Sequence, residues 1–176
     1  MGRSNAPRIL LVGRPGVGKT TVVRRLASLL SSMRVSLGGF TTEEIRVAGR
    51  RVGFVVESLS GEHGVLAHVD LAGPPRVGKY GVDLAAFERI ALPGLAAPAD
   101  VIVIDELGKM ELASAPFRDA VQALFDREIP LIATVHAHHD PFTDALKRRP
   151  DVELVHVTER KREELPARLA EGLGSP

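Results

Sequence analysis

The stretch Gly13-Arg14-Pro15-Gly16-Val17-Gly18-Lys19-Thr20 decides how this chain can fold. It matches the phosphate-binding pattern G-x-x-x-x-G-K-[ST]. An apolar run at 8–12 predicts a buried strand before it, and apolar residues at helical spacing over 22–30 predict a helix after it. Glycines let successive backbone N–H groups point inward and approach phosphate oxygens closely. The helix that follows offers its positive N-terminal end to the same anion.

Two side chains of this stretch suit nucleotide chemistry. Lys19 can reach the β- and γ-phosphates of a nucleoside triphosphate, and the Thr20 hydroxyl can coordinate Mg²⁺. We therefore expect a triphosphate substrate and Mg²⁺ as the cofactor. A glycine-rich turn without a ligand would need all four fixed positions to coincide by chance, in roughly one chain in a hundred of this length. The residues expected to contact the nucleotide here are Gly13, Arg14, Pro15, Gly16, Val17, Gly18, Lys19, Thr20 and Thr21.

Length and composition favour one ordinary globular domain over residues 1–176. The chain is 44% hydrophobic, carries a net charge of +1 and contains no cysteine, which excludes disulfides and thiolate metal sites. The near-neutral charge gives no general attraction to nucleic acid or membranes. The N-terminus lacks the apolar core of a signal peptide, and no apolar run approaches the ~20 residues that span a bilayer. We expect a cytoplasmic monomer with neither a membrane nor a nucleic-acid partner.

Strand and helix patterns alternate along the chain, which predicts an α/β fold with a mostly parallel central sheet. The turn residues around 48–50 and 60–62 predict an antiparallel extension of that sheet. Pro93 and Gly94 are expected to stop a helix, and the segment 70–80 is expected to form a long functional loop. Strands are predicted at 8–12, 40–47, 52–59, 65–69, 100–104, 131–135 and 153–157, and helices at 19–31, 83–91, 116–127, 141–147 and 160–171.

A second part of the site is predicted at Asp105 and Glu106, which follow the four apolar residues 101–104. Such a run indicates a buried parallel strand, and ligands of open α/β sheets lie beyond the carboxyl ends of the strands. Asp105 is expected to bind Mg²⁺ opposite Thr20. Glu106 is expected to orient or deprotonate an attacking water, which favours hydrolysis over transfer to another acceptor. The alternative is a polar strand end that only faces solvent.

Three cations are candidates for stabilising charge on the γ-phosphate in the transition state: Arg76, Lys79 and Lys109. A solvated surface position is the competing interpretation for each. The stretch His136-Ala137-His138-His139-Asp140 could suggest a metal cluster, but zinc needs better-spaced ligands. We favour a polar contact of Thr134 or His136 with the phosphates. The sequence contains no N-K-x-D motif to select guanine.

Several segments together resemble the small P-loop nucleoside-triphosphatases first described from thermophiles, a family that includes the human cancer-related nucleoside-triphosphatase. The resemblance rests on the phosphate-binding stretch and on the segments 39–46, 53–54, 76–82 and 105–112. It implies Mg²⁺-dependent hydrolysis of ATP, GTP, CTP and UTP to diphosphate and phosphate. It also implies a three-layer, RecA-like P-loop fold, extended by antiparallel strands. The chain departs from the family at Thr41, where an aromatic residue is usual, and at Lys161-Arg162-Glu163, where Asn-Arg-Asp is usual.

Two other functions remain open at this point. A small P-loop kinase would phosphorylate a nucleotide or metabolite, and would release little phosphate without its acceptor. A nucleotide-dependent RNA-binding switch would turn over slowly and bind RNA with a steep dependence on salt.

Overall fold

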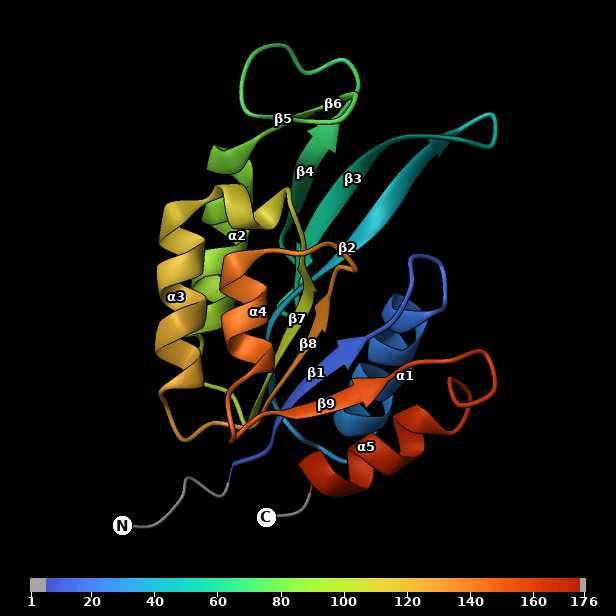
Figure 1. The fold of residues 1–176 in the computed structure, drawn as a ribbon, viewed down its shortest axis with the longest axis vertical. Helices are drawn as coiled ribbons and strands as arrows, with labels where there is room; N and C mark the ends of the chain where they lie inside the picture. Colours follow the sequence, from blue (N-terminus) through green and yellow to red (C-terminus); the bar gives the residue numbers. More distant parts are fainter. Residues whose placement is uncertain (1–5, 175–176) are drawn as a thin grey trace.

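The computed structural model describes residues 6–174, and its strands there join into one nine-stranded sheet with the order β5-β6-β4-β3-β2-β7-β8-β1-β9 (Figure 1). Strands β2, β7, β8, β1 and β9 pair in parallel, whereas β2, β3, β4, β6 and β5 pair antiparallel in that order. The predicted parallel core with an antiparallel extension is confirmed. The strands are β1 Arg8–Val12, β2 Leu37–Val47, β3 Arg50–Ser58, β4 His63–His68, β5 Arg76–Val77, β6 Tyr80–Val82, β7 Val101–Leu107, β8 Leu131–Val135 and β9 Glu153–His156.

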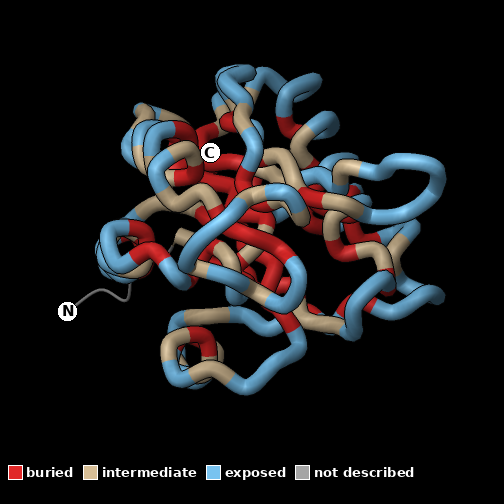
Figure 2. Tube along the Cα trace, turned by 90° about the horizontal axis from the view of Figure 1, so that it is seen from above, coloured by how far each residue is buried: buried red, intermediate tan, exposed pale blue. Residues whose placement is uncertain are grey.

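Helices cover both faces of the parallel core and produce three layers. Helices α1 (Lys19–Ser32) and α5 (Leu165–Leu173) lie on one face, and α2 (Leu84–Ala96), α3 (Ala115–Phe125) and α4 (Pro141–Lys147) lie on the other (Figure 1). A short 3-10 helix, η1, spans Glu111–Ala113. Figure 2 shows the sheet as a buried centre with exposed loops around it.

Strand β7 shows why the central strands lack a polar face. Val101 and Val103 pack into the core beneath α1 and α5, and Ile102 and Ile104 pack into the core beneath α2 and α3. Successive side chains point to opposite faces of a sheet. Because helices cover both faces, the strand is apolar at every position until it reaches Asp105 at its carboxyl end.

Helix α2 continues through Pro93 and Gly94, so the predicted helix stop at these residues is wrong. Gly94 is required for packing: a Cβ on it would lie 2.6 Å from the carbonyl oxygen of Gly39 in β2. Gly39 itself adopts a φ of +96°, and a Cβ there would collide with the backbone of Val103. These glycines let the helix and two strands approach closely, and this tertiary contact outweighs the local helix-breaking preference.

Three other boundaries differ from expectation. Helix α5 begins at Leu165 because residues 159–164 form turns, and Pro166 lies in its first turn, where proline is tolerated. Strand β7 extends past Ile104 to Leu107. The second part of the predicted 70–80 loop forms the β5–β6 hairpin, which pairs with β4.

None of the helices within residues 6–174 combines the length and the apolar character that a bilayer span requires.

Candidate functional site

The loop between β1 and α1 adopts the conformation that its glycines allow. Gly16 and Gly18 have φ values of +77° and +111°, a region that side chains disfavour. The buried Lys19 side chain lies inside the loop, where its Nζ donates to the carbonyl oxygens of Gly13 (2.8 Å) and Arg14 (3.3 Å). Burial lowers the pKa of Lys19, and the charges of Glu106 and Asp105 oppose that shift. The loop therefore surrounds the ammonium group of Lys19, and two of its carbonyl oxygens accept hydrogen bonds from that group.

The carboxyl end of β7 lies beside this loop, as the sequence predicts. The Thr20 hydroxyl donates to Asp105 Oδ1 at 3.3 Å, and the buried Thr134 hydroxyl of β8 donates to the same oxygen at 2.7 Å. Asp105 is 1% exposed, and among the described residues its Oδ2 has no hydrogen-bond partner. Burial raises the pKa of Asp105, against the lowering effect of the bonds from Thr134 and Thr20.

The side chains of Thr20 and Asp105 fit a Mg²⁺ ion bound together with phosphates. A buried carboxylate oxygen without a partner is costly unless a cation or donor satisfies it. Mg²⁺ is usually held by one or two protein oxygens, with waters and substrate phosphates as the other ligands. The part of the chain that the structure describes contains no group of three or more His, Cys, Asp or Glu side chains arranged for a metal. A Mg²⁺ ion held by Thr20 and Asp105 would therefore take its other ligands from waters and substrate phosphates.

Glu106 follows Asp105 directly, and the two are joined by a cis peptide bond. Its side chain lines the cleft above the phosphate loop. Burial, together with the negative charge of Asp105, raises the pKa of Glu106. This carboxylate therefore lies in the wall of the same cleft as Lys19 and Thr20, and its role in the reaction stays a prediction.

A third carboxylate, Glu111 on η1, was given no role from the sequence. Glu111 is buried, and a Cβ on Gly108 would lie 2.9 Å from both Glu111 Oε2 and Glu106 Oε1. The two carboxyl groups therefore flank Gly108, and a side chain at this position would displace them. Burial and then the charge of Glu106 raise the pKa of Glu111 well above its usual range. The sequence could have indicated this pair of carboxylates through Gly108, a glycine that lies between Glu106 and Glu111 in the chain.

The site opens into a cleft of about 570 Å³, which lies within the size range of small-molecule pockets. Within the phosphate loop, Gly13 and Arg14 supply carbonyl groups to Lys19, and Val17 belongs to the core instead of the lining. The lining residues are Pro15, Gly16, Gly18, Lys19, Thr20, Thr21, Arg24, Thr42, Glu43, Glu44, Arg46, Arg51, Phe54 and Glu106.

Sequence reasoning missed the contribution of the β2–β3 hairpin to this cleft. Arg46, Arg51 and Phe54 come from that hairpin, and Arg24 comes from the turn of α1 that follows Thr20. A helical spacing of four residues places Arg24 on the same face as Thr20, which the sequence could have indicated. The hairpin residues lie near the loop only because β2 pairs with β7.

The three predicted transition-state cations are not among the described residues that line the cleft. Arg76 lies in the β5–β6 hairpin, where its guanidinium donates to the carbonyl oxygens of Leu71 (3.0 Å) and Lys79 (2.9 Å). The Nζ of Lys79 lies 5.4 Å from the centroid of the Tyr80 ring. Lys109 is exposed and acts electrostatically on His136. Their catalytic role stays a prediction.

His136 is brought close to the site without a polar contact to it. The side chain is buried, and neither ring nitrogen has a hydrogen-bond partner within residues 6–174. Burial, followed by the charge of nearby His138, lowers the pKa of His136 and favours its neutral form. Thr134, the other candidate, donates a hydrogen bond to Asp105, and the predicted contact of either residue with the phosphates stays a prediction.

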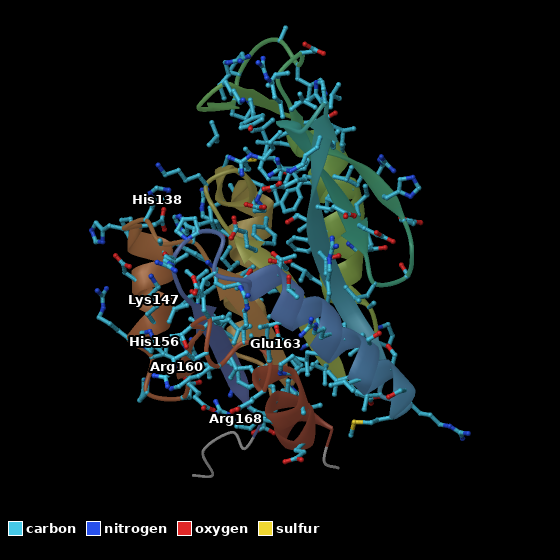
Figure 3. The ribbon with its side chains drawn as sticks, turned by 90° about the vertical axis from the view of Figure 1, so that its right-hand side faces the viewer. His138, Lys147, His156, Arg160, Glu163 and Arg168 are labelled. Carbon is cyan, nitrogen blue, oxygen red and sulfur yellow. The ribbon has the colours of Figure 1, made fainter. Side chains whose placement is uncertain are left out.

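Several basic side chains lie on α4, β9, α5 and the turns between β9 and α5. Figure 3 labels Lys147 on α4, His156 on β9, Arg160 in those turns and Arg168 on α5. Lys147 forms an ion pair with Asp144 at 3.6 Å. This pairing agrees with a solvated surface, and the expected absence of a nucleic-acid partner stays a prediction.

Comparisons with known proteins agree with this geometry. A family model described as NTPase matches residues 8–170. The chain is 45% identical over 161 residues to nucleoside-triphosphatase THEP1 of Thermotoga petrophila, covering 90% of this chain and 88% of that protein. The crystal structure of THEP1 from Aquifex aeolicus superposes with a TM-score of 0.85 at 31% identity, covering 96% of this chain and 99% of that one. The solution structure of a human cancer-related nucleoside triphosphatase gives a TM-score of 0.82 at 38% identity, covering 96% and 97%.

Proposed function

This chain belongs to the NTPase family, and we propose on that basis that it hydrolyses nucleoside 5′-triphosphates to diphosphates and phosphate with Mg²⁺ in the cleft beside Lys19. The observation that carries the proposal is the meeting of Thr20, Asp105 and Glu106 at one end of the phosphate loop. The names of the relatives support the same activity.

Substrate binding is assigned to the loop and to Lys19. The backbone N–H groups of the loop would surround the phosphates. The Lys19 ammonium would exchange its carbonyl partners for β- and γ-phosphate oxygens. Thr20 and Asp105 would hold Mg²⁺, which when bound neutralises charge on the same oxygens. Because the lysine is already buried in the loop, little rearrangement is needed when the substrate arrives.

The chemical step is assigned to Glu106. Its carboxylate would accept a hydrogen bond from a water placed in line with the γ-phosphate. The water oxygen forms a bond to the γ-phosphorus while the bond to the β–γ bridging oxygen breaks. The diphosphate leaves, and the water proton is taken by Glu106.

Base selectivity is expected to be weak, because the contacts assigned to the substrate involve phosphates. ATP, GTP, CTP and UTP should be hydrolysed within about tenfold of one another in kcat/KM, equivalent to ~1.4 kcal/mol of discrimination. Phosphate release in the presence of Mg²⁺ and no other acceptor measures this directly. A hundredfold preference for one base would contradict broad specificity. Only trace phosphate release with all four would instead favour a kinase or a nucleotide switch.

Replacing Asp105 with asparagine should change the response to Mg²⁺. The substitution keeps the shape of the side chain and removes the charge that faces the metal, so the Mg²⁺ concentration for half-maximal nucleotide binding should rise about tenfold or more. The measurement is a Mg²⁺ titration of triphosphate binding. Asp126→Asn on the surface is the matched control, and an unchanged Mg²⁺ midpoint in Asp105→Asn would remove Asp105 from the metal site.

A further inference from the structure

The sheet order fixes which way a bound triphosphate runs. The phosphate loop follows β1, whereas Asp105 and Glu106 lie near the carboxyl end of β7, two strands away across β8. If these acids mark the γ-phosphate, the nucleoside must extend the opposite way, toward β9. The segment after β9 already contacts the loop there, since Arg162 donates to the carbonyl oxygen of Val17 at 3.4 Å.

The cleft also continues past the γ-phosphate position in the other direction, along β2 and β3. Arg46 and Arg51 line this end, and both bind the single carboxylate of Glu44, at 2.6 Å and 3.0 Å. Two guanidinium groups sharing one carboxylate leave a net positive charge. The arginine side chains are 55% and 46% exposed, so an incoming ligand can reach them.

An aromatic ring lies beside these cations. The Arg51 guanidinium carbon lies 5.3 Å from the centroid of the Phe54 ring, and Phe54 also lines the cleft. The Phe54 ring also makes an edge-to-face contact with the ring of Tyr80, with the centroids 5.4 Å apart. Guanidinium groups match the geometry of phosphate, and flat aromatic or guanidinium surfaces stack on nucleobases.

We propose that the end of the cleft formed by Arg46, Arg51 and Phe54 is a second binding site, which takes a nucleoside monophosphate beside the γ-phosphate of the triphosphate. The orientation of the triphosphate rests on the proposed function. The arginines bind the phosphate of the second nucleotide, and the Phe54–Arg51 surface receives its base. Because this ligand lies on the side from which water attacks, its binding slows hydrolysis without displacing the triphosphate.

Calorimetric titration of AMP into the protein saturated with Mg²⁺ and a non-hydrolysable ATP analogue tests the site. AMP is expected to bind with a Kd below about 1 mM, and Arg46→Ala and Arg51→Ala should each weaken it about tenfold. Arg50→Ala removes a cation from the same hairpin outside the cleft lining, and should leave AMP binding unchanged. Phe54→Leu should abolish the preference for AMP over ribose 5-phosphate. The affinity of each variant for the ATP analogue shows whether its triphosphate site is intact.

Competition between AMP and the ATP analogue for one site would overturn the proposal, because the arginine end would then hold the substrate's own nucleoside. An equal loss of affinity for AMP and the analogue in Arg51→Ala would overturn it in the same way. The proposal would also fail if AMP bound but none of the cleft substitutions changed its affinity. It would fail as well if no binding were detected at about 10 mM AMP, tenfold above the expected upper limit of the Kd. Phosphate release by the wild-type protein without AMP is measured separately, so failure of the hydrolase assignment is recognised independently.

Discussion

Replacing Lys19 with alanine is expected to reduce triphosphate hydrolysis about a thousandfold and to weaken triphosphate binding. The ammonium group of Lys19 is buried inside the phosphate loop and bonded to the carbonyl oxygens of Gly13 and Arg14. Arg14, the other cation among the residues of that loop, is exposed and forms an ion pair with Glu159 instead. A positioned donor to developing charge is worth two to three orders of magnitude in rate, roughly.

The measurement is single-turnover phosphate release combined with a titration of nucleotide binding. Lys147→Ala is the matched control, since Lys147 lies on α4 in an ion pair with Asp144. That variant should hydrolyse ATP at the wild-type rate. If Lys19→Ala also retained the wild-type rate, the loop between β1 and α1 could not be the phosphate site.

Replacing Glu106 with glutamine should lower the rate of hydrolysis by about two to four orders of magnitude while triphosphate binding stays near that of the wild type. Glutamine keeps the shape of the side chain and can still form hydrogen bonds, but it cannot accept the proton of the attacking water. Asp105 is not expected to replace it, because we assign its carboxylate, which already accepts a hydrogen bond from Thr20, to the Mg²⁺ ion. The expected result is thus a loss of kcat with little change in affinity.

Single-turnover kinetics and equilibrium binding of a non-hydrolysable analogue separate these two effects. Glu62→Gln, in the exposed turn between β3 and β4, provides the control for a general effect of losing one negative charge. Wild-type hydrolysis by Glu106→Gln would show that another group accepts the proton. A parallel fall in binding would instead place Glu106 among the groups that hold the nucleotide.

Local chemistry made much of the site predictable from the sequence. Glycines and Lys19 form a loop that depends mainly on its own backbone, with φ values of +77° and +111° at Gly16 and Gly18. Asp105 and Glu106 could be placed because a strand buried on both faces is apolar until its end. That these two elements meet also followed, since carboxyl ends of parallel strands lie along one edge of the sheet.

Predictions failed where distant contacts outweigh local preference. Pro93 and Gly94 indicate the end of a helix, yet α2 continues because Gly94 packs against the carbonyl oxygen of Gly39. The buried Glu111 and Glu106 come together on either side of Gly108, where a Cβ would lie 2.9 Å from a carboxylate oxygen of each. Neither contact leaves a periodic pattern in the sequence.

The sequence by itself determined the strand–loop–helix unit, the phosphate-binding loop and the acids that face it, because each rests on residues close together in the chain. Only the tertiary structure decided what surrounds the reacting end of the cleft. Pairing of β2 with β7 brings Arg46, Arg51 and Phe54 to that end. Arg76 is instead bonded to the carbonyl oxygens of Leu71, before the β5–β6 hairpin, and Lys79, in its turn. Charged side chains on exposed hairpins carry no local sign of their partners, so which of them faces a ligand depends on the pairing of the strands.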